Sequence, residues 1–279
     1  MYKGIRIALT VCAVLAAAGL ALVLAGYLMG GSPNFSLDWK NRKITTPDAA
    51  EVRSERTPEA FRALEIEAAT ADITVERGES WSLRYALFDE PEITERGGTL
   101  KIKTTEHGSI GIVGISFDRS RAPSITVTVP ADAALDRITV TTAAGDITLS
   151  ALEAGAVSLM CGTGDIRLRD VSAAELDIEA NTGDVIVENA SCAGQADVEG
   201  NTGDIRISEF TVSGELECET NTGDVSLSLP EGDYALELET DLGDVIVDGK
   251  AQGRRYDSGS GVPVHAETNT GDVRFSNHP

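Results

Sequence analysis

The sequence has 279 residues and a formal net charge of −22, from 45 acidic and 23 basic side chains. This balance excludes a general nucleic-acid binder, because neutralising phosphates requires clustered lysine and arginine. The surface should instead attract cations or basic partners. Aromatic residues make up 5% of the chain, which favours a thin core of Val, Ile, Leu and Ala.

The amino-terminal region predicts a membrane anchor. A short basic segment, residues 1–6, precedes residues 7–29, which are uncharged and mostly apolar. A run of this length can cross a bilayer with some tilt, so we expect a transmembrane helix there. A cleaved signal peptide is the alternative. Its small-residue cleavage site would follow the apolar core, however, and Ala16–Ala18 lies inside the run.

The next two segments lead into a folded domain. Residues 30–60 mix Pro, Thr and both charges, which is typical of a flexible stalk. Residues 61–136 contain the period-2 alternation of half-buried strands, and we expect a first rung and amino-terminal capping strands there. Within them, the apolar, Gly-rich loop 106–117 either covers the end of the domain or forms an exposed contact patch.

Residues 137–279 repeat one short motif, which is Gly-Asp followed by Ile or Val. Its copies are Gly145-Asp146, Gly164-Asp165, Gly183-Asp184, Gly203-Asp204, Gly223-Asp224, Gly243-Asp244 and Gly271-Asp272. The steps between them are 19, 19, 20, 20, 20 and 28 residues, and a degenerate copy begins at Ala71. Self-similarity with a period near 20 indicates stacked units that bury their apolar sides against their neighbours.

Each repeat predicts a strand, a turn and a second strand. Small or apolar residues stand eight, six and four positions before the aspartate, polar residues stand between them, and the alternation resumes after it. Glycine suits the turn because it adopts positive φ without a Cβ clash. Asn or Asp beside it can hydrogen-bond the local backbone.

Two all-β folds satisfy this pattern. In a parallel β-solenoid, or β-helix, each unit of about 20 residues is one rung, and like residues stack roughly 4.8 Å apart. In an antiparallel meander, Asn-Thr-Gly would be a hairpin loop. The sequence favours a solenoid of about eight rungs, because near-identical residues at near-identical phase gain most when they stack on their own copies.

The chain resembles the bacterial family of β-strand-repeat proteins named putative adhesins. The basic amino terminus, the single hydrophobic run, Thr70–Ile73 and the Thr-Gly-Asp-Ile/Val units carry the resemblance, from Met1 to about Phe275. It implies a parallel β-solenoid displayed outside the membrane, with no assigned activity. Together with the Gly30–Pro33 break, it favours a single-pass cell-membrane protein whose carboxyl-terminal domain is extracytoplasmic. The flanking charges nearly balance and leave this orientation open.

Parallel stacking would align the outward acidic residues of the repeats into two adjacent columns. These are Asp177, Glu179, Asp197, Glu199, Glu217, Glu219, Glu237 and Glu239. Neighbouring carboxylates repel by about 1 kcal/mol at 4 Å even in water, a cost that solvent and salt can carry. The columns are either a solvated face or a surface that collects cations or a basic partner. Ca²⁺ is the suited ion, since it accepts many oxygen ligands in loose geometry.

The turn aspartates would form a third column. We interpret them as turn-capping residues rather than metal ligands, because the nine-residue period of Gly-rich calcium repeats is absent. Arg167, Arg206 and Arg274 stand two residues after their aspartates and are interpreted as solubilising or paired charges.

An insertion at residues 251–262 explains the step of 28 residues and predicts a loop on one flank of the stack. Arg254, Arg255 and Tyr256 form a basic and aromatic cluster in it, so it is either an ordinary exposed loop or a contact site.

The four cysteines are interpreted as small buried thiols rather than a disulfide framework. Cys161 and Cys218 fall on inward columns, Cys192 falls in a return loop, and Cys12 falls in the hydrophobic run.

The sequence contains no constellation typical of catalysis. His107, His265 and His278 are dispersed, and the carboxylates are periodic rather than singular. We therefore expect a binding or adhesin-like module of the cell envelope, with no catalytic residues, no cofactor, an unidentified surface partner and no affinity for nucleic acid. An envelope-stress sensory or regulatory partner protein is the alternative. A carbohydrate-active enzyme on a β-helix is a more remote one.

Overall fold

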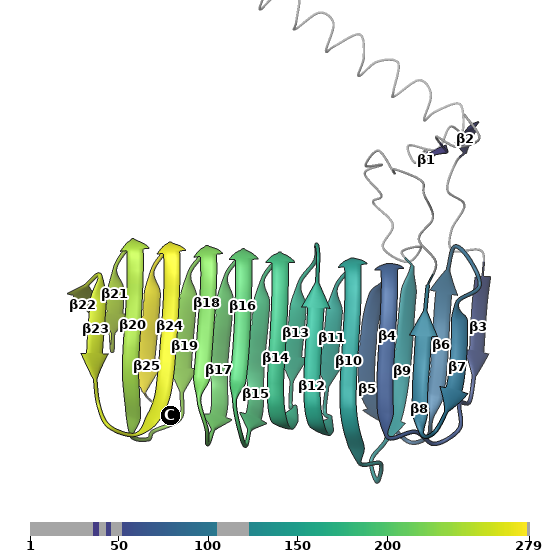
Figure 1. The fold of residues 1–279 in the computed structure, drawn as a ribbon, viewed down its shortest axis with the longest axis horizontal. Coiled ribbons are helices and arrows are strands. Elements are labelled where there is room, and N and C mark those ends of the chain that lie inside the picture. Colours follow the sequence, from purple (N-terminus) through teal and green to yellow (C-terminus); the bar gives the residue numbers. More distant parts are fainter. Residues whose placement is uncertain (1–35, 39–42, 46–51, 105–122, 278–279) are drawn as a thin grey trace, which may run out of the picture. The chain divides into compact units, whose positions relative to one another are not determined.

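The computed structural model describes residues 36–38, 43–45, 52–104 and 123–277, and every regular element among them is a β-strand (Figure 1). The expected transmembrane helix, the loop 106–117 and most of the expected stalk lie outside the described residues. Within the described part, no helix combines the length and apolar character needed to cross a membrane.

The chain divides into two units. In the first, β1 (Ser36–Asp38) and β2 (Lys43–Thr45) pair in antiparallel fashion. The second unit, Ala50–Glu106 with Ala122–Pro279, contains all the repeats. Its strands stack side by side in two facing layers (Figure 1).

The strands of the second unit form two layers, each with its own stacking order. The first layer runs β7 (Glu92–Arg96), β8 (Thr99–Lys103), β4 (Ala63–Thr70), β10 (Leu135–Ala144), β12 (Glu153–Cys161), β14 (Ser172–Thr182), β16 (Ala196–Thr202), β18 (Leu216–Thr222), β24 (Val262–Thr270), β20 (Tyr234–Leu242) and β23 (Arg255–Ser258). The second runs β3 (Val52–Arg56), β6 (Ser82–Leu87), β9 (Ser124–Pro130), β5 (Asp72–Gly78), β11 (Ile147–Ser150), β13 (Ile166–Arg169), β15 (Val185–Cys192), β17 (Ile205–Val212), β19 (Val225–Leu229), β25 (Val273–Asn277), β21 (Val245–Val247) and β22 (Lys250–Gly253).

Equivalent residues of successive repeats lie side by side, because the repeat strands pair in parallel. Asp177 pairs with Asp197, which pairs with Glu217, and in the second layer Val185 pairs with Ile205, which pairs with Val225. The all-β solenoid predicted from the repeat is confirmed, and the alternative of an antiparallel meander is wrong for the repeats.

A coil is defined here as one first-layer strand together with the second-layer strand that follows it in the sequence. In the described residues the coils stack in the order β8–β9, β4–β5, β10–β11, β12–β13, β14–β15, β16–β17, β18–β19, β24–β25 and β20–β21. The coil β8–β9 has no Gly-Asp motif in the sequence between its two strands. This coil is the reason that counting motifs gives one coil fewer than the structure has.

The coils follow chain order in the middle of the stack but not at its ends. At the carboxyl end, β24–β25 lies between β18–β19 and β20–β21 (Figure 1). The insertion at 251–262, expected as a flanking loop, contributes to β22 and β23, which pair antiparallel with β21 and β20 and cover the outer edge of that coil. The last segment of the chain can then pair only on the inner edge.

The amino end is closed in the same way. Strands β6 and β7 pair antiparallel with β9 and β8, and β3 pairs with β6. Phe61 and Trp81 fill this end, with ring centroids 4.3 Å apart, whereas Phe88 is 44% exposed. Antiparallel cover at both ends hides the open edges of the parallel stack, and charged residues such as Arg53 and Arg56 line the outermost strand β3.

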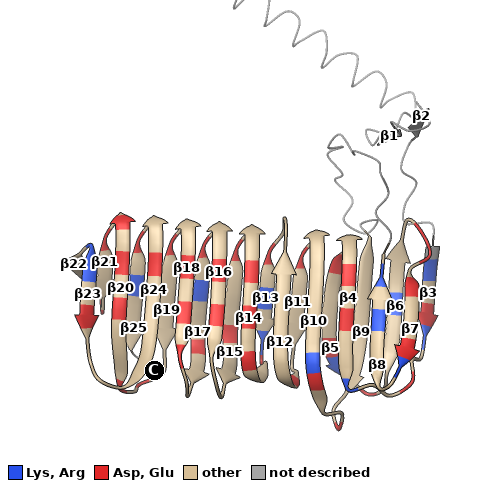
Figure 2. Ribbon diagram, in the orientation of Figure 1, with Lys and Arg blue, Asp and Glu red and all other residues tan. Residues whose placement is uncertain are grey.

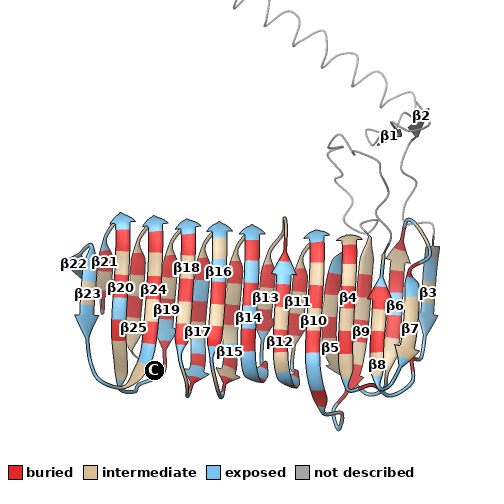
Figure 3. Ribbon diagram, in the orientation of Figure 1, coloured by how far each residue is buried: buried red, intermediate tan, exposed pale blue. Residues whose placement is uncertain are grey.

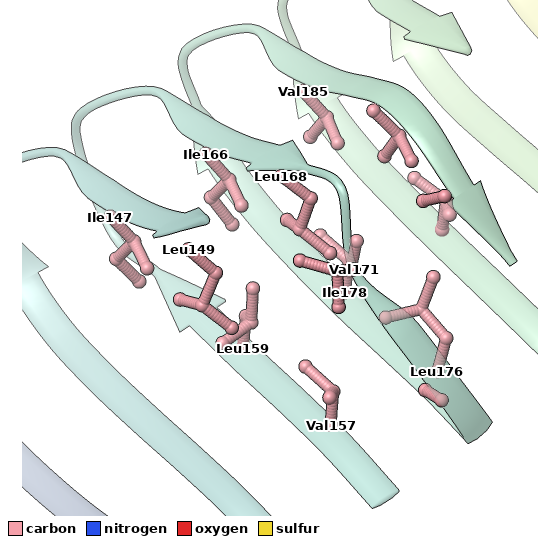
Figure 4. Packing of buried hydrophobic residues seen from close by; sticks show 14 of the residues in the cluster. Ile147, Leu149, Val157, Leu159, Ile166, Leu168, Val171, Leu176, Ile178 and Val185 are labelled. Atoms are coloured by element: carbon pink, nitrogen blue, oxygen red, sulfur yellow. The ribbon is translucent and has the colours of Figure 1, made fainter. Parts of the chain in front are cut away.

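The core lies between the two layers and is built from the predicted inward columns (Figures 3 and 4). Figure 4 shows Ile147, Ile166 and Val185 from the second layer facing the space between the layers that also receives Leu159 and Ile178 from the first. All of these side chains are buried. Burial of such aliphatic side chains contributes about 1.5–3 kcal/mol each, so the core is the main stabilising element of the stack.

The return segments are more regular than the sequence indicates. The start of β14 pairs with the end of β15, through Ser172 with Ser191 and Ala173 with Cys192. Cys192 therefore lies in a strand and is buried, rather than in a loose return loop. These segments form a narrow third side of the coil.

The turn glycines are required by both backbone conformation and space. Gly203 has a φ of 142°, which residues with a Cβ rarely adopt. A Cβ at this position would lie 2.0 Å from the carbonyl oxygen of Gly183 in the adjoining coil. Adjacent turns therefore pack backbone against backbone.

Candidate functional site

The turn aspartates form a hydrogen-bonded column along one edge of the stack. The backbone N–H of each aspartate after the first donates to Oδ1 of the aspartate in an adjoining coil, at 2.8–3.0 Å. The order is Asp72, Asp146, Asp165, Asp184, Asp204, Asp224, Asp272 and Asp244. Each carboxylate before the last thus caps the turn stacked on it.

Arginines bridge most of the aspartates in this turn column. Arg206 contacts Asp184 at 3.0 Å and Asp204 at 2.5 Å, and Arg167 and Arg274 bridge two aspartates in the same way. The three arginines occupy alternate coils, which keeps their own charges apart. The N–H of Asp204 and the Arg206 guanidinium hold the pKa of Asp184 below its usual value. Three arginines thus bridge six of the eight aspartates and neutralise part of the charge of the column.

The outer side of the first layer carries a second set of carboxylates. We call acidic face the outward acidic residues of β14, β16, β18, β24 and β20, which are Asp177, Glu179, Asp197, Glu199, Glu217, Glu219, Glu267, Glu237 and Glu239. Figure 2 shows these acidic bands side by side on neighbouring strands. The parallel register thus brings together the two predicted acidic columns, in a block interrupted only by His265.

Partial burial and charge repulsion both raise pKa values on this face. Partial burial, and then the neighbouring carboxylates Glu199, Glu217, Asp177 and Glu219, raise the pKa of Asp197 to about 6. The pKa of Glu219 is also raised, by burial and by Glu217 and Glu267. Within the described residues, Asp197, Glu199 and Glu217 have no Lys or Arg partner.

The amino-terminal end of the same columns is arranged differently. Lys101 contacts Glu65 at 3.2 Å and Glu67 at 2.6 Å, and Lys103 contacts Glu67 at 2.7 Å. Hydrogen bonds from these lysines lower the pKa of Glu67 to about 2. Between this paired end and the acidic face, the columns hold Thr139, Thr141, Ser158 and Met160. In these two columns, the carboxylates without a Lys or Arg partner thus lie in the carboxyl-terminal half of the stack.

Arg255 closes the acidic face at the carboxyl end. It contacts Glu237 at 2.9 Å, Glu239 at 3.0 Å and Asp257 at 2.9 Å. Tyr256 is half-buried and packs against the core. Of the cluster singled out in the insertion, Arg254 is thus the exposed cation that makes no ion pair within the described residues.

His265 enters the acidic face through the reordering of the last two coils. Its Nε2 lies 3.7 Å from carboxylate oxygens of Glu219 and Glu267, and its Nδ1 lies 3.8 Å from Glu237. Glu217, Glu219 and His265 each offer one donor atom, and these three atoms lie within 4.8 Å of one another. Chain order alone would place the β20 carboxylates directly against β18, so the position of His265 could not be found from the spacing of the repeats.

The three described cysteines are buried and free. Burial raises the pKa of Cys161 to about 11 and also raises the pKa values of Cys192 and Cys218. Thiols held in the neutral form are poor nucleophiles and metal ligands. These cysteines belong to the core rather than to a site.

Comparison with known proteins gives one family match. A sequence model of the family described as Toastrack DUF4097 matches residues 61–276, which is most of the chain. No curated protein matches the sequence.

Several crystal structures are similar to this chain, each at 14% identity. One is described as a putative adhesin from Bacteroides fragilis, with a TM-score of 0.40, covering 81% of this chain and 96% of that one. Another, a putative adhesin from Parabacteroides merdae, has a TM-score of 0.36 and covers 82% and 94%. A third, a putative lipid binding protein from Parabacteroides distasonis, has a TM-score of 0.30 and covers 82% and 96%.

Proposed function

Because the chain belongs to the Toastrack DUF4097 family, β-strand-repeat proteins of the putative-adhesin kind with no assigned activity, we propose that it is a non-enzymatic binding module. Its binding surface is the acidic face, and the partner it takes is cationic.

The single observation that supports this proposal is the selective lack of neutralisation on the acidic face. Arginines bridge the turn aspartates, and lysines pair with Glu65 and Glu67. Elsewhere in the stack, basic residues therefore pair with stacked carboxylates. Along the turn column, for example, an arginine stands in every second coil. Over β14, β16 and β18 the chain keeps the repulsion, which adds to partial burial in raising the pKa of Asp197. Charge that costs stability is retained where a partner uses it.

The geometry fits an extended basic polypeptide. The coils repeat at about 4.8 Å, so a carboxylate is available at each step along the face. A flexible cationic chain lying across the strands can match this ladder with Lys or Arg side chains. Such binding is fast and salt-dependent, because it is driven by long-range attraction between exposed charges.

In this proposal the module works at the cell envelope. Residues 7–29 form the single-pass anchor, with the stack on the extracytoplasmic side. Of residues 30–60, only the part that precedes β3 serves as the stalk, because β3 belongs to the stack. The support for this placement is the uncharged apolar run and its break at Gly30–Pro33. A face raised off the membrane surface by a stalk would be open to partners in the envelope.

Oligolysine binding to the full-length chain in non-ionic detergent tests the proposal. We expect calorimetry to give a dissociation constant that rises steeply between low and physiological salt. The double variant Glu199→Gln/Glu217→Gln should weaken binding roughly tenfold, at about 0.2–1 kcal/mol for each exposed charge pair. A calcium titration of the same proteins would report whether the face also takes divalent cations.

The matched control is Glu79→Gln/Glu209→Gln, which makes the same change in net charge at exposed positions beside β5 and in β17, both in the second layer. It should leave oligolysine affinity within about twofold of the original. The proposal is overturned if the unmodified chain binds no oligolysine at low salt, or if both double variants weaken binding equally.

A further inference from the structure

The acidic face differs from a plain carboxylate stripe at one coil. Equivalent positions in the column hold Asp177, Asp197, Glu217 and Glu237, whereas β24 contributes His265. Because β24 is inserted between β18 and β20, this imidazole has carboxylates of both neighbouring strands beside it. It is half-buried, with 25% of its side chain exposed. The chain reordering thus builds a mixed nitrogen and oxygen cluster.

The two nitrogens of His265 face different partners. Nδ1 lies 3.8 Å from Oε2 of Glu237, and the other oxygen of Glu237 accepts a hydrogen bond from Arg255 at 2.9 Å. Nε2 lies 3.7 Å from Glu219 and from Glu267. Metal-binding histidines characteristically direct one nitrogen at an anchored carboxylate, which fixes the tautomer and leaves the other nitrogen for the metal. Glu237 is the carboxylate beside Nδ1, and a small side-chain rotation would bring the 3.8 Å separation into hydrogen-bond range.

The separations around Nε2 also suit a shared ion. Donors bound to one zinc ion at about 2.0–2.2 Å lie about 3.3–3.5 Å apart in tetrahedral geometry. The observed 3.7 Å between Nε2 and each of two carboxylates is too long for a hydrogen bond and slightly wider than that spacing. Small side-chain rotations would close it.

We propose that Glu217, Glu219 and His265 bind a divalent transition metal of the Zn²⁺ class, with Glu267 as the available fourth donor and Glu237 orienting the imidazole. The nitrogen donor separates this site from the general attraction of cations by the acidic face, because Ca²⁺ and Mg²⁺ prefer oxygen ligands while imidazole suits Zn²⁺. The site goes beyond the proposed binding of a cationic partner and does not depend on it.

Zinc calorimetry on the full-length chain, compared with His265→Ala, tests the site. His107 and His278 lie outside the described residues and could also bind zinc. The site is therefore measured as the difference in bound zinc between the original chain and His265→Ala. We expect one such equivalent, at least a tenfold loss of affinity in Glu219→Gln, and a 10- to 100-fold loss in Glu237→Gln, which alters only the orienting carboxylate. Zinc should also raise the melting temperature of the original chain more than that of His265→Ala.

The control is Glu199→Gln, a carboxylate of the same face that lies outside the cluster and has the same charge change as Glu219→Gln. It should keep zinc affinity within twofold. Equal losses in Glu199→Gln and Glu219→Gln, or zinc binding unchanged in His265→Ala, would overturn the site. Oligolysine binding should be retained in His265→Ala, which removes no carboxylate, so the two proposals can fail separately.

Discussion

The turn column and the acidic face stack carboxylates in the same coils, with opposite consequences. In the turn column each carboxylate up to the last accepts an N–H from the adjoining turn, and arginines at alternate coils bridge the charges. On the acidic face the side chains stand out from the strands, and over β16 and β18 no cation accompanies them within the described residues. A repeated acid is therefore structural where the repeat also supplies a donor, and available for binding where it does not.

The largest expected effect comes from the tight packing of the turn column. Gly203→Ala would place a methyl group 2.0 Å from the Gly183 carbonyl oxygen at a φ of 142°. We expect a loss of about 3–5 kcal/mol in the free energy of unfolding, measured by urea denaturation of the full-length chain. The loss should come from clash and backbone strain together.

The control for this prediction is Gly97→Ala in the turn between β7 and β8. Gly97 also has positive φ, at 60°, but nothing lies within 4 Å of its added Cβ. It should cost only about 1–2 kcal/mol. Equal losses at the two positions would mean that conformation alone, and not the stacking of turns, makes the repeat glycines necessary.

Removing one acid from each region should change stability in opposite directions. Asp204→Ala leaves the N–H of Asp224 without its acceptor and takes one partner from Arg206, so we expect a loss of about 1–3 kcal/mol. Glu199→Gln relieves repulsion on the acidic face and should add about 0.2–1 kcal/mol at low salt. Both values are measured by urea denaturation.

Asp204→Asn serves as the milder control, because its amide oxygen can still accept the Asp224 N–H. It should lose less stability than Asp204→Ala. If Glu199→Gln destabilises the chain as much as Asp204→Ala, the acidic face is a structural ladder like the turn column, and the comparison between the two regions is wrong.

The two regions should also respond to pH in separate windows. The folded-state pKa of Asp197, about 6, lies above its ordinary value of 3.8, so the native state binds this proton more tightly than the unfolded chain. Its contribution to stability should therefore rise as the pH falls from above 6 towards 4. Asp184 has a lowered pKa, so its contribution is present above its ordinary value and is lost as the pH falls further.

Urea midpoints at pH 7, 5 and 3 would separate these contributions. Asp197→Asn should flatten the change between pH 7 and 5, and Asp184→Asn should flatten the change between pH 5 and 3. An unaltered profile in Asp197→Asn would show that this carboxylate ionises normally in the folded chain.

Periodicity was sufficient to predict the coils, but it could not predict their neighbours. Position within a repeat determines which way a side chain points, so the burial of Ile178 and Val198 and the outward acids follow from spacing alone. The order of coils at the ends depends on which free edge a later segment reaches. The sequence of β24 does not indicate that β23 covers the outer edge of β20, so the contacts of His265 were not predictable.

The smallest effect on stability is expected from placing a lysine among the carboxylates of the acidic face. Glu217→Lys would place an ammonium group beside Asp197 and Glu219, as Lys101 stands beside Glu65 and Glu67. We expect a gain of about 0.2–1 kcal/mol at low salt that disappears at high salt, because the new pairs are exposed and screened. Oligolysine binding should fall at the same time. Glu209→Lys adds the same charge at an exposed position in the second layer and should do neither, so a gain in both variants would reflect net charge rather than local pairing. If Glu217→Lys stabilises the chain and abolishes binding together, the same unneutralised carboxylates both cost stability and bind the partner.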